Sequence, residues 1–172
     1  MSPRRDVNPS PIVRFNIGAT LVFSVVAVVS AIVFDDLFRV VIVAVSLSLF
    51  AVGVATFLLG FFAAVQLSRE REISVTQLFF LTGSVADRTV KIPMSVCLAV
   101  QTAVGIAAAI ARPSTDGKAG SVLAFGVLVP MLGLGLNGLW ASRHGAFDER
   151  SLPDDAPDAQ PETDSEVDPD AQ

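Results

Sequence analysis

The side chains that could bind a ligand lie within long apolar stretches of the chain. Gln101 and Thr102 are the most polar residues of one stretch, and Asn137 is the most polar residue of another. In lipid, such groups form hydrogen bonds between helices that are worth about 0.6–2 kcal/mol. A polar ligand held between the two helices is the alternative. We expect Gln101 near mid-membrane and Asn137 toward one end of its helix, so the two amides should not touch each other.

The chain has little else with which to do chemistry. Its one cysteine, Cys97, cannot by itself build a disulfide framework, a CxxC redox pair or a zinc site. Its one histidine, His144, has no cysteine or acid pair near it and does not indicate a metal site. We therefore predict no catalytic residue, no metal and no cofactor, and classify the protein as non-enzymatic.

The elements that position these residues are four predicted membrane-spanning helices. Hydrophobic residues make up 52% of the 172 residues and charged residues 17%, whereas globular domains have about 25% charged residues. Four apolar runs contain no Asp, Glu, Lys or Arg, and each could cross a hydrocarbon core about 30 Å thick. We predict an all-α polytopic membrane domain, 15–142, with spans at about 15–34, 40–67, 92–111 and 119–141. Because ionisable residues inside spans usually mark ion paths, the pattern disfavours a proton-coupled transporter.

The basic residues predict the orientation of the spans. Nine of the twelve lie in the N-terminal arm (1–14), the connection between the second and third spans (68–91) and the region after the fourth span. Basic residues concentrate on the cytoplasmic side of membrane proteins. The termini and the connection are therefore predicted to be cytoplasmic, while Asp35, Asp36 and Asp116 in the short loops face outward.

The C-terminal segment, 143–172, is predicted to be a disordered acidic tail. From Asp148 onward it holds ten acidic residues and one basic residue, whereas residues 1–147 hold eleven basic and seven acidic residues. The net charge of −5 thus combines a basic body with an acidic tail. The tail is too poor in apolar residues to fold alone, so it either contacts a basic partner or only solubilises the chain.

Small residues mark the predicted packing faces of two helical hairpins, 12–67 and 91–142. Helices in lipid associate by close packing, which small residues permit. These faces hold together either the bundle itself or a complex with another membrane protein. Pro130 should kink the fourth helix because it removes a backbone hydrogen bond. The small residues on these faces are Gly53, Thr56, Gly60, Ala63, Ser95, Ala99, Ala103, Gly105, Ala107, Ala109, Gly126, Gly133, Gly135 and Gly138.

The connection is predicted to contain a short helix. Ser74 and Gln77 have the spacing of a capping box, and Gly83 suits the C-terminal cap. Two positions for this helix remain open. It either lies on the inner leaflet, with Phe79 and Phe80 inserted in the membrane, or packs across the end of the bundle.

Further membrane anchors are expected at the end of the fourth span. Trp140 and Arg143 follow the last apolar turns, and tryptophan and arginine are typical of the headgroup boundary. Together with Phe79 and Phe80, they would fix the depth of the cytoplasmic end of the bundle.

Two segments resemble a family of small actinobacterial four-span membrane proteins whose function is uncharacterised. The resemblance covers the four-span core but not the arm or the tail. It implies the same topology and a plasma-membrane location, and it transfers no active-site residue. The segments are Phe79-Phe80-Leu81-Thr82-Gly83-Ser84 and Phe125-Gly126-Val127-Leu128-Val129-Pro130-Met131-Leu132-Gly133-Leu134-Gly135-Leu136, continuing to Gly138-Leu139-Trp140 and His144-Gly145.

These features favour a protein that acts by association, as an accessory subunit or scaffold of the cell envelope. Its expected partners are the lipid bilayer and a membrane protein or a second copy of the chain, with no nucleic acid. The alternative is a small channel or transporter for an uncharged or amphiphilic solute that uses Gln101 and Asn137.

Overall fold

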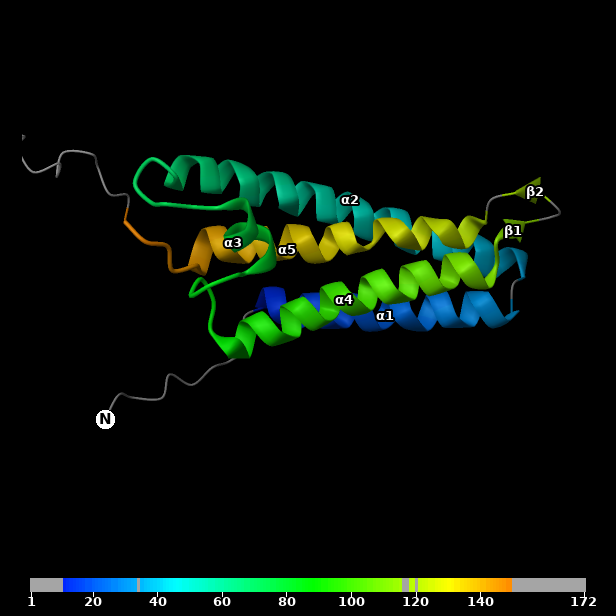
Figure 1. The fold of residues 1–172 in the computed structure, drawn as a ribbon. Helices are drawn as coiled ribbons and strands as arrows, with labels where there is room; N and C mark the ends of the chain where they lie inside the picture. Colours follow the sequence, from blue (N-terminus) through cyan, green and yellow to red (C-terminus); the bar gives the residue numbers. More distant parts are fainter. Residues whose placement is uncertain (1–10, 34, 116–117, 120, 150–172) are drawn as a thin grey trace, which may run out of the picture.

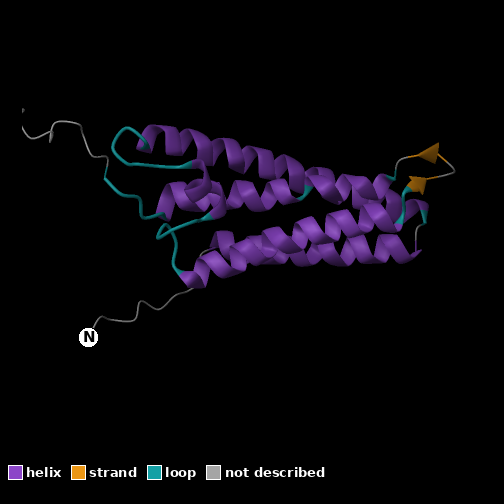
Figure 2. Ribbon diagram, viewed as in Figure 1, coloured by secondary structure: helices purple, strands orange, loops and turns teal. Residues whose placement is uncertain are grey.

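The computed structural model describes residues 11–33, 35–115, 118–119 and 121–149, which form an elongated helical bundle (Figures 1 and 2). The long helices are α1 (Pro11–Val33), α2 (Asp36–Leu67) and α4 (Arg88–Ala111). The fourth span combines a 3₁₀ segment, η1 (Val122–Leu128), with α5 (Pro130–His144). These four helical segments are long and apolar enough to cross a membrane, which confirms the predicted fold class and fits a multi-pass membrane protein.

Three of the helices begin before their apolar runs. Pro11 starts α1, Asp36 starts α2 and Arg88 starts α4, four residues earlier than predicted in each case. The difference arises because polar residues can begin a helix outside the hydrocarbon. At α2, Asp35 accepts a hydrogen bond from the Asp36 N–H at 2.8 Å, and Arg39 pairs with Asp36 at 3.2 Å. The 32 residues of α2 are about 48 Å long, longer than the hydrocarbon core.

The fourth span is not the single helix predicted for 119–141. Ala119 belongs to a two-residue strand, β2 (Lys118–Ala119), which pairs with β1 (Ser114–Thr115). The η1 segment follows, and the Val129 N–H donates to the Gly126 carbonyl at 3.1 Å. Pro130 then begins α5, where a missing N–H costs little. Pro130 thus begins a new helix after the 3₁₀ segment and does not interrupt a continuous helix, which differs from the predicted kink.

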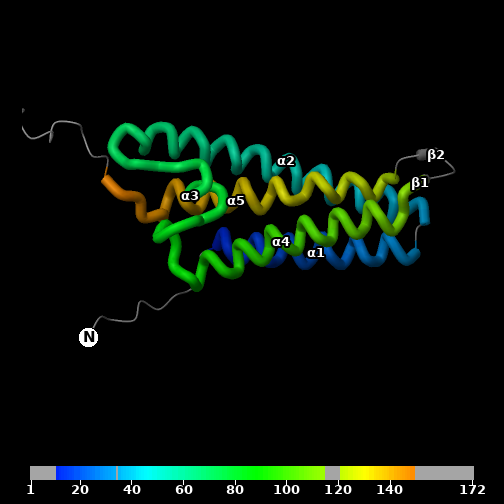
Figure 3. Tube along the Cα trace, in the orientation of Figure 1, coloured from blue at the N-terminus to red at the C-terminus, as the bar shows by residue number. Residues whose placement is uncertain are grey.

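The two hairpins pack against each other with α2 beside α5 and α1 beside α4 (Figures 1 and 3). The most extensive contact between helices joins α2 and α5, which belong to different hairpins. The start of α1, the end of α5 and the connection lie at one end of the bundle, and the β1–β2 loop lies at the other (Figure 1). The 68–91 connection, the start of α1 and the end of α5 are therefore on one side (Figure 1), as an even number of spans requires.

Predicted glycines allow the close approach of α2 and the fourth span. A Cβ at Gly60 would lie 2.7 Å from the carbonyl carbon of Gly138, and a Cβ at Gly53 would lie 2.5 Å from the Leu132 nitrogen. Gly135 faces the α2 backbone in return, and Gly105 of α4 faces the Gly126 carbonyl. Because the obstacles are backbone atoms, no side chain can simply move aside. These positions serve the packing of the bundle itself.

The connection contains the predicted short helix, α3 (Val75–Phe80). Its capping box is confirmed: the Gln77 N–H donates to Ser74 Oγ at 3.2 Å, and the Ser74 N–H donates to Gln77 Oε1 at 3.1 Å. The expectation that Gly83 forms the C-terminal cap is wrong. Leu81 takes the left-handed conformation there, with φ 53°, and its side chain is fully buried. Burying a leucine contributes about 1.5–3 kcal/mol, which offsets a left-handed penalty of about 1–2 kcal/mol.

Candidate functional site

The largest buried polar cluster in the described bundle joins α1 and α4 around Gln101. Its Nε2 donates to Asn16 Oδ1 at 3.1 Å and to Thr20 Oγ1 at 2.8 Å. Thr20 Oγ1 in turn donates to the Asn16 carbonyl at 2.7 Å, and Asn16 Nδ2 contacts the Met94 sulfur at 3.4 Å. These contacts favour the interhelical role for Gln101 over a ligand contact.

The oxygen of the Gln101 amide lies in a different environment. Gln101 Oε1 is buried and has no hydrogen-bond partner among the described residues. A Cβ added at Gly133 would lie 2.9 Å from this oxygen, so the absence of a side chain at Gly133 makes room for it. Gly133 is thus a packing residue, as predicted. The group that packs against it is the Gln101 side-chain amide and not a helix backbone.

The structure differs from the sequence-based prediction of buried polar residues at two positions, Thr102 and Asn16. Thr102 is exposed and bonds only to its own helix, through the Leu98 carbonyl at 2.9 Å. Asn16, which the sequence analysis missed, is fully buried. Its spacing of four residues from Thr20 places both on one helical face, a signal that would have identified it.

Asn137 connects the fourth span to α3. Its Nδ2 donates to the carbonyl of Phe79, the penultimate residue of α3, at 2.9 Å, and both atoms are buried. Asn137 and Gln101 bond to different partners, as expected. The Phe79 ring packs on Gly138 and stacks on Phe57 with a centroid distance of 4.3 Å. A buried amide, a glycine and a ring stack therefore fix α3 across the end of the bundle.

This arrangement decides between the two positions considered for α3. Phe79 is only 5% exposed and packs within the protein, so it is not a membrane anchor. Phe80 is 51% exposed and is free to contact lipid. Trp140, predicted at the headgroup boundary, is also buried and stacks on His144 at 5.6 Å, whereas Arg143 is exposed. Phe80 and Arg143 thus remain the candidate anchors.

The start of the predicted tail is folded onto the connection. The Ala146 N–H donates to the Val85 carbonyl at 3.1 Å, and the Glu72 N–H donates to the Asp148 carbonyl at 3.0 Å. Arg71 Nη1 donates to the Phe147 carbonyl at 2.9 Å. The prediction of disorder from 143 is therefore wrong for 143–149, because composition does not reveal that Phe147 is buried there. The acidic residues from 150 onward lie outside the described residues, as do Asp116 and residues 1–10.

One predicted packing face is not used inside the bundle. Ser95, Ala99, Ala103 and Ala107, four residues apart along α4, are all exposed. The buried face of α4 instead carries Met94, Cys97, Gln101, Gly105 and Ala108. We call the four exposed residues the α4 small-residue face. Ala107 of this face also lines an apolar groove between α1 and α4, which has a volume of about 220 Å³.

The described residues contain no group of three or more His, Cys, Asp or Glu side chains placed to hold a metal ion. Cys97 is buried as a free thiol. The chain matches no protein-family model, no curated protein and no solved structure.

Proposed function

We propose that this protein is a non-enzymatic integral membrane protein that acts by association, as an accessory subunit or scaffold of the cell envelope. It resides in the plasma membrane, with both termini and the connection in the cytoplasm. The four apolar helices and the excess of basic residues at the connection end support this location and orientation. The partner is a helix of another membrane protein or of a second copy of the chain.

The observation that carries this proposal is the exposed α4 small-residue face. Small residues allow helix backbones to approach closely in lipid, which is how helices associate there. The glycines of α2 and α5 are already engaged with each other, whereas the α4 face has no helix against it in the described bundle. The neighbouring groove between α1 and α4 continues this surface and offers a depression for a second helix.

The channel or transporter alternative has less support. It relied on Gln101 and Asn137 as ligand contacts, and the NH₂ group of each amide is engaged in hydrogen bonds within the protein. Both side chains are fully buried. A solute would have to displace contacts that join α1 to α4 and α5 to α3.

The test is to substitute Ala103→Leu and measure association in native membranes by mild solubilisation and size analysis of the complex. A leucine side chain on the α4 face should prevent close helix approach and reduce the fraction of the chain in a complex. Ala51→Leu, an equally conservative change at an exposed residue of α2, is the matched control. Recovery of the wild-type chain only as a lone monomer would overturn the proposal.

Orientation has its own test. Single cysteines at Thr82 in the connection and at Ser114 in the opposite loop, both exposed, can be labelled with an impermeant reagent in intact cells. We expect labelling at Ser114→Cys and none at Thr82→Cys until the cells are opened. The reverse pattern would contradict the cytoplasmic placement of the connection.

A further inference from the structure

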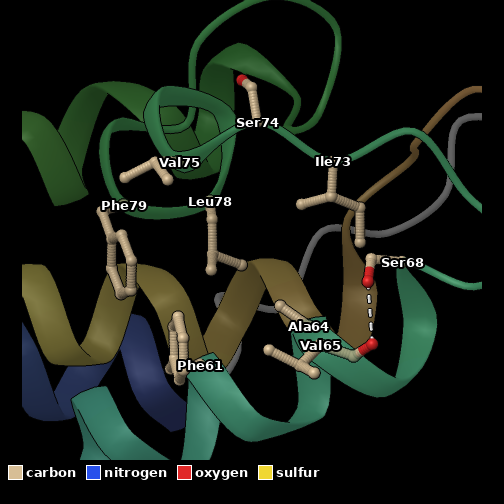
Figure 4. A pocket seen from close by; sticks show the side chains of 9 residues that line it. All are labelled: Phe61, Ala64, Val65, Ser68, Ile73, Ser74, Val75, Leu78 and Phe79. Carbon is tan, nitrogen blue, oxygen red and sulfur yellow. Dashed lines mark hydrogen bonds between the residues drawn. The ribbon is translucent and has the colours of Figure 1, made fainter.

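A groove separates the last two turns of α2 from α3 (Figure 4). Its volume is about 170 Å³. Phe61, Ala64 and Val65 form the wall from α2, and Val75 and Leu78 face them from α3 (Figure 4). Ser68, at the end of this groove, donates its hydroxyl to the Val65 carbonyl at 2.8 Å, so it offers no unsatisfied donor to the apolar walls. The groove therefore suits an apolar occupant.

The groove lies at a depth where acyl chains are available. Because α2 is longer than the hydrocarbon core, its final turns reach the boundary between hydrocarbon and headgroups. Val75 is 69% exposed and Val65 49% exposed at the rim, so the groove opens outward rather than into the bundle. Water would be unfavourable against such walls, whereas a hydrocarbon chain that enters the groove stays in an apolar environment.

Charges of alternating sign follow directly on the groove. Arg69, Glu70, Arg71 and Glu72 continue the chain after Ser68, and Arg69, Glu70 and Glu72 are exposed. Arg71 is held by the Phe147 carbonyl. A headgroup with a phosphate and an ammonium group complements this strip, since Arg69 can meet the phosphate and a glutamate the ammonium. A purely anionic headgroup would meet a glutamate without compensation.

We infer that the α2–α3 groove binds one acyl chain of a zwitterionic phospholipid, such as a phosphatidylethanolamine, with its headgroup over Arg69 and Glu70. The inference rests on the proposed membrane location but is independent of the α4 small-residue face. It assigns the connection a role in holding a lipid at the end of the bundle.

The experiment uses the full chain reconstituted in bilayers of equal phosphatidylethanolamine and phosphatidylglycerol, then released in mild detergent for native mass spectrometry. We expect one retained phosphatidylethanolamine per chain and a preference over phosphatidylglycerol of about two- to fivefold, the size expected of one exposed charge pair. Equal retention of both lipids, or retention of none, would overturn the inference.

Variants locate the retained lipid. Val65→Trp and Val75→Trp fill the groove from opposite walls and should each abolish retention, while Leu59→Trp, on an exposed part of α2 outside the groove, should not. Glu70→Gln should retain the lipid but lose the headgroup preference, because only phosphatidylethanolamine carries the ammonium. Arg69→Gln should weaken retention of both lipids and keep the preference, because both carry the phosphate. An equal loss of retained lipid in Leu59→Trp would show that the lipid does not bind in the groove.

A second measurement tests the inference on the wild-type chain, in case the Val65→Trp and Val75→Trp variants do not fold. A phosphatidylethanolamine with a photoreactive acyl chain should label residues 61–78 of the wild-type chain more strongly than the exposed residues of α1. Labelling in proportion to exposure alone would overturn the inference. Absence of the chain from the membrane fraction would defeat the proposed location as well, whereas lipid loss with intact association would defeat only the lipid site.

Discussion

Asn137 of α5 donates a hydrogen bond to the backbone carbonyl of Phe79 at 2.9 Å, and this bond holds α3 against the end of the helical bundle. The donor and the acceptor are 58 residues apart in the chain. The same helix α5 provides Gly138, on which the Phe79 ring lies. Helix α5 thus positions α3, and with it one wall of the α2–α3 groove.

Removing this bond should loosen α3 selectively. Asn137→Leu leaves the Phe79 carbonyl buried without a donor, a cost of about 1–3 kcal/mol. We expect faster hydrogen exchange at the amides of α3, with little change in α1. Thr102→Val, which removes an exposed hydroxyl that bonds only within α4, is the control. Unchanged exchange in Asn137→Leu would show that Phe79 stacking alone holds α3.

The Gln101 cluster should stabilise the pairing of α1 with α4. Gln101→Leu removes both hydrogen bonds to Asn16 and Thr20, and we expect a loss of about 1–2 kcal/mol in the free energy of unfolding in detergent. Asn16→Leu should cost a similar amount. Because both changes remove one shared bond, the double variant should lose less than the sum of the two single variants. If the losses in the free energy of unfolding were strictly additive, Gln101 and Asn16 would not share a hydrogen bond.

Glycine at position 60 should be required for the contact between α2 and α5. Gly60→Ala places a methyl group against the Gly138 backbone, and such overpacking costs about 1–3 kcal/mol. Gly18→Ala, where a Cβ meets nothing within 4 Å, should be neutral or stabilise the helix by about 0.5–1 kcal/mol. Thermal unfolding of both variants measures the difference. Equal stability of the two would contradict the tight approach.

Arg71 should hold the segment 145–149 on the connection. Arg71→Ala removes the bond to the Phe147 carbonyl and should expose this segment to limited proteolysis. A charge-assisted hydrogen bond contributes about 1.5–3 kcal/mol, so the increase in cleavage should be at least about tenfold. Arg88→Ala removes another exposed base, at the start of α4, and serves as the control. Identical cleavage in both variants would show that the backbone bonds suffice.

Local sequence patterns predicted the fold where the cause is local. The four apolar runs located the long helices, because length and composition alone decide whether a helix can cross a membrane. Ser74 and Gln77 located the start of α3, since a capping box depends on residues three apart. Pro130 marks the point where the fourth span changes from 3₁₀ to α geometry, although the predicted cause, a lost hydrogen bond within one helix, does not apply.

Features that depend on tertiary contacts were not predictable in this way. The sequence shows that Gly105 and Ala103 are both small, but only the bundle shows that Gly105 faces inward and Ala103 outward. The polarity of residues 143–149 hid the burial of Phe147. Likewise, Gly83 is the intrinsically better cap, and Leu81 takes the left-handed position only because the bundle buries its side chain.

The most direct test of association concerns Ala103 itself. A photoreactive amino acid at Ala103, activated in native membranes, reports what lies against the α4 small-residue face, and the same group at Ala51 provides the control. We expect a discrete protein adduct from Ala103, of the mass of a second copy or of one defined partner, and only lipid adducts from Ala51. Lipid adducts alone from both positions would contradict the proposed association.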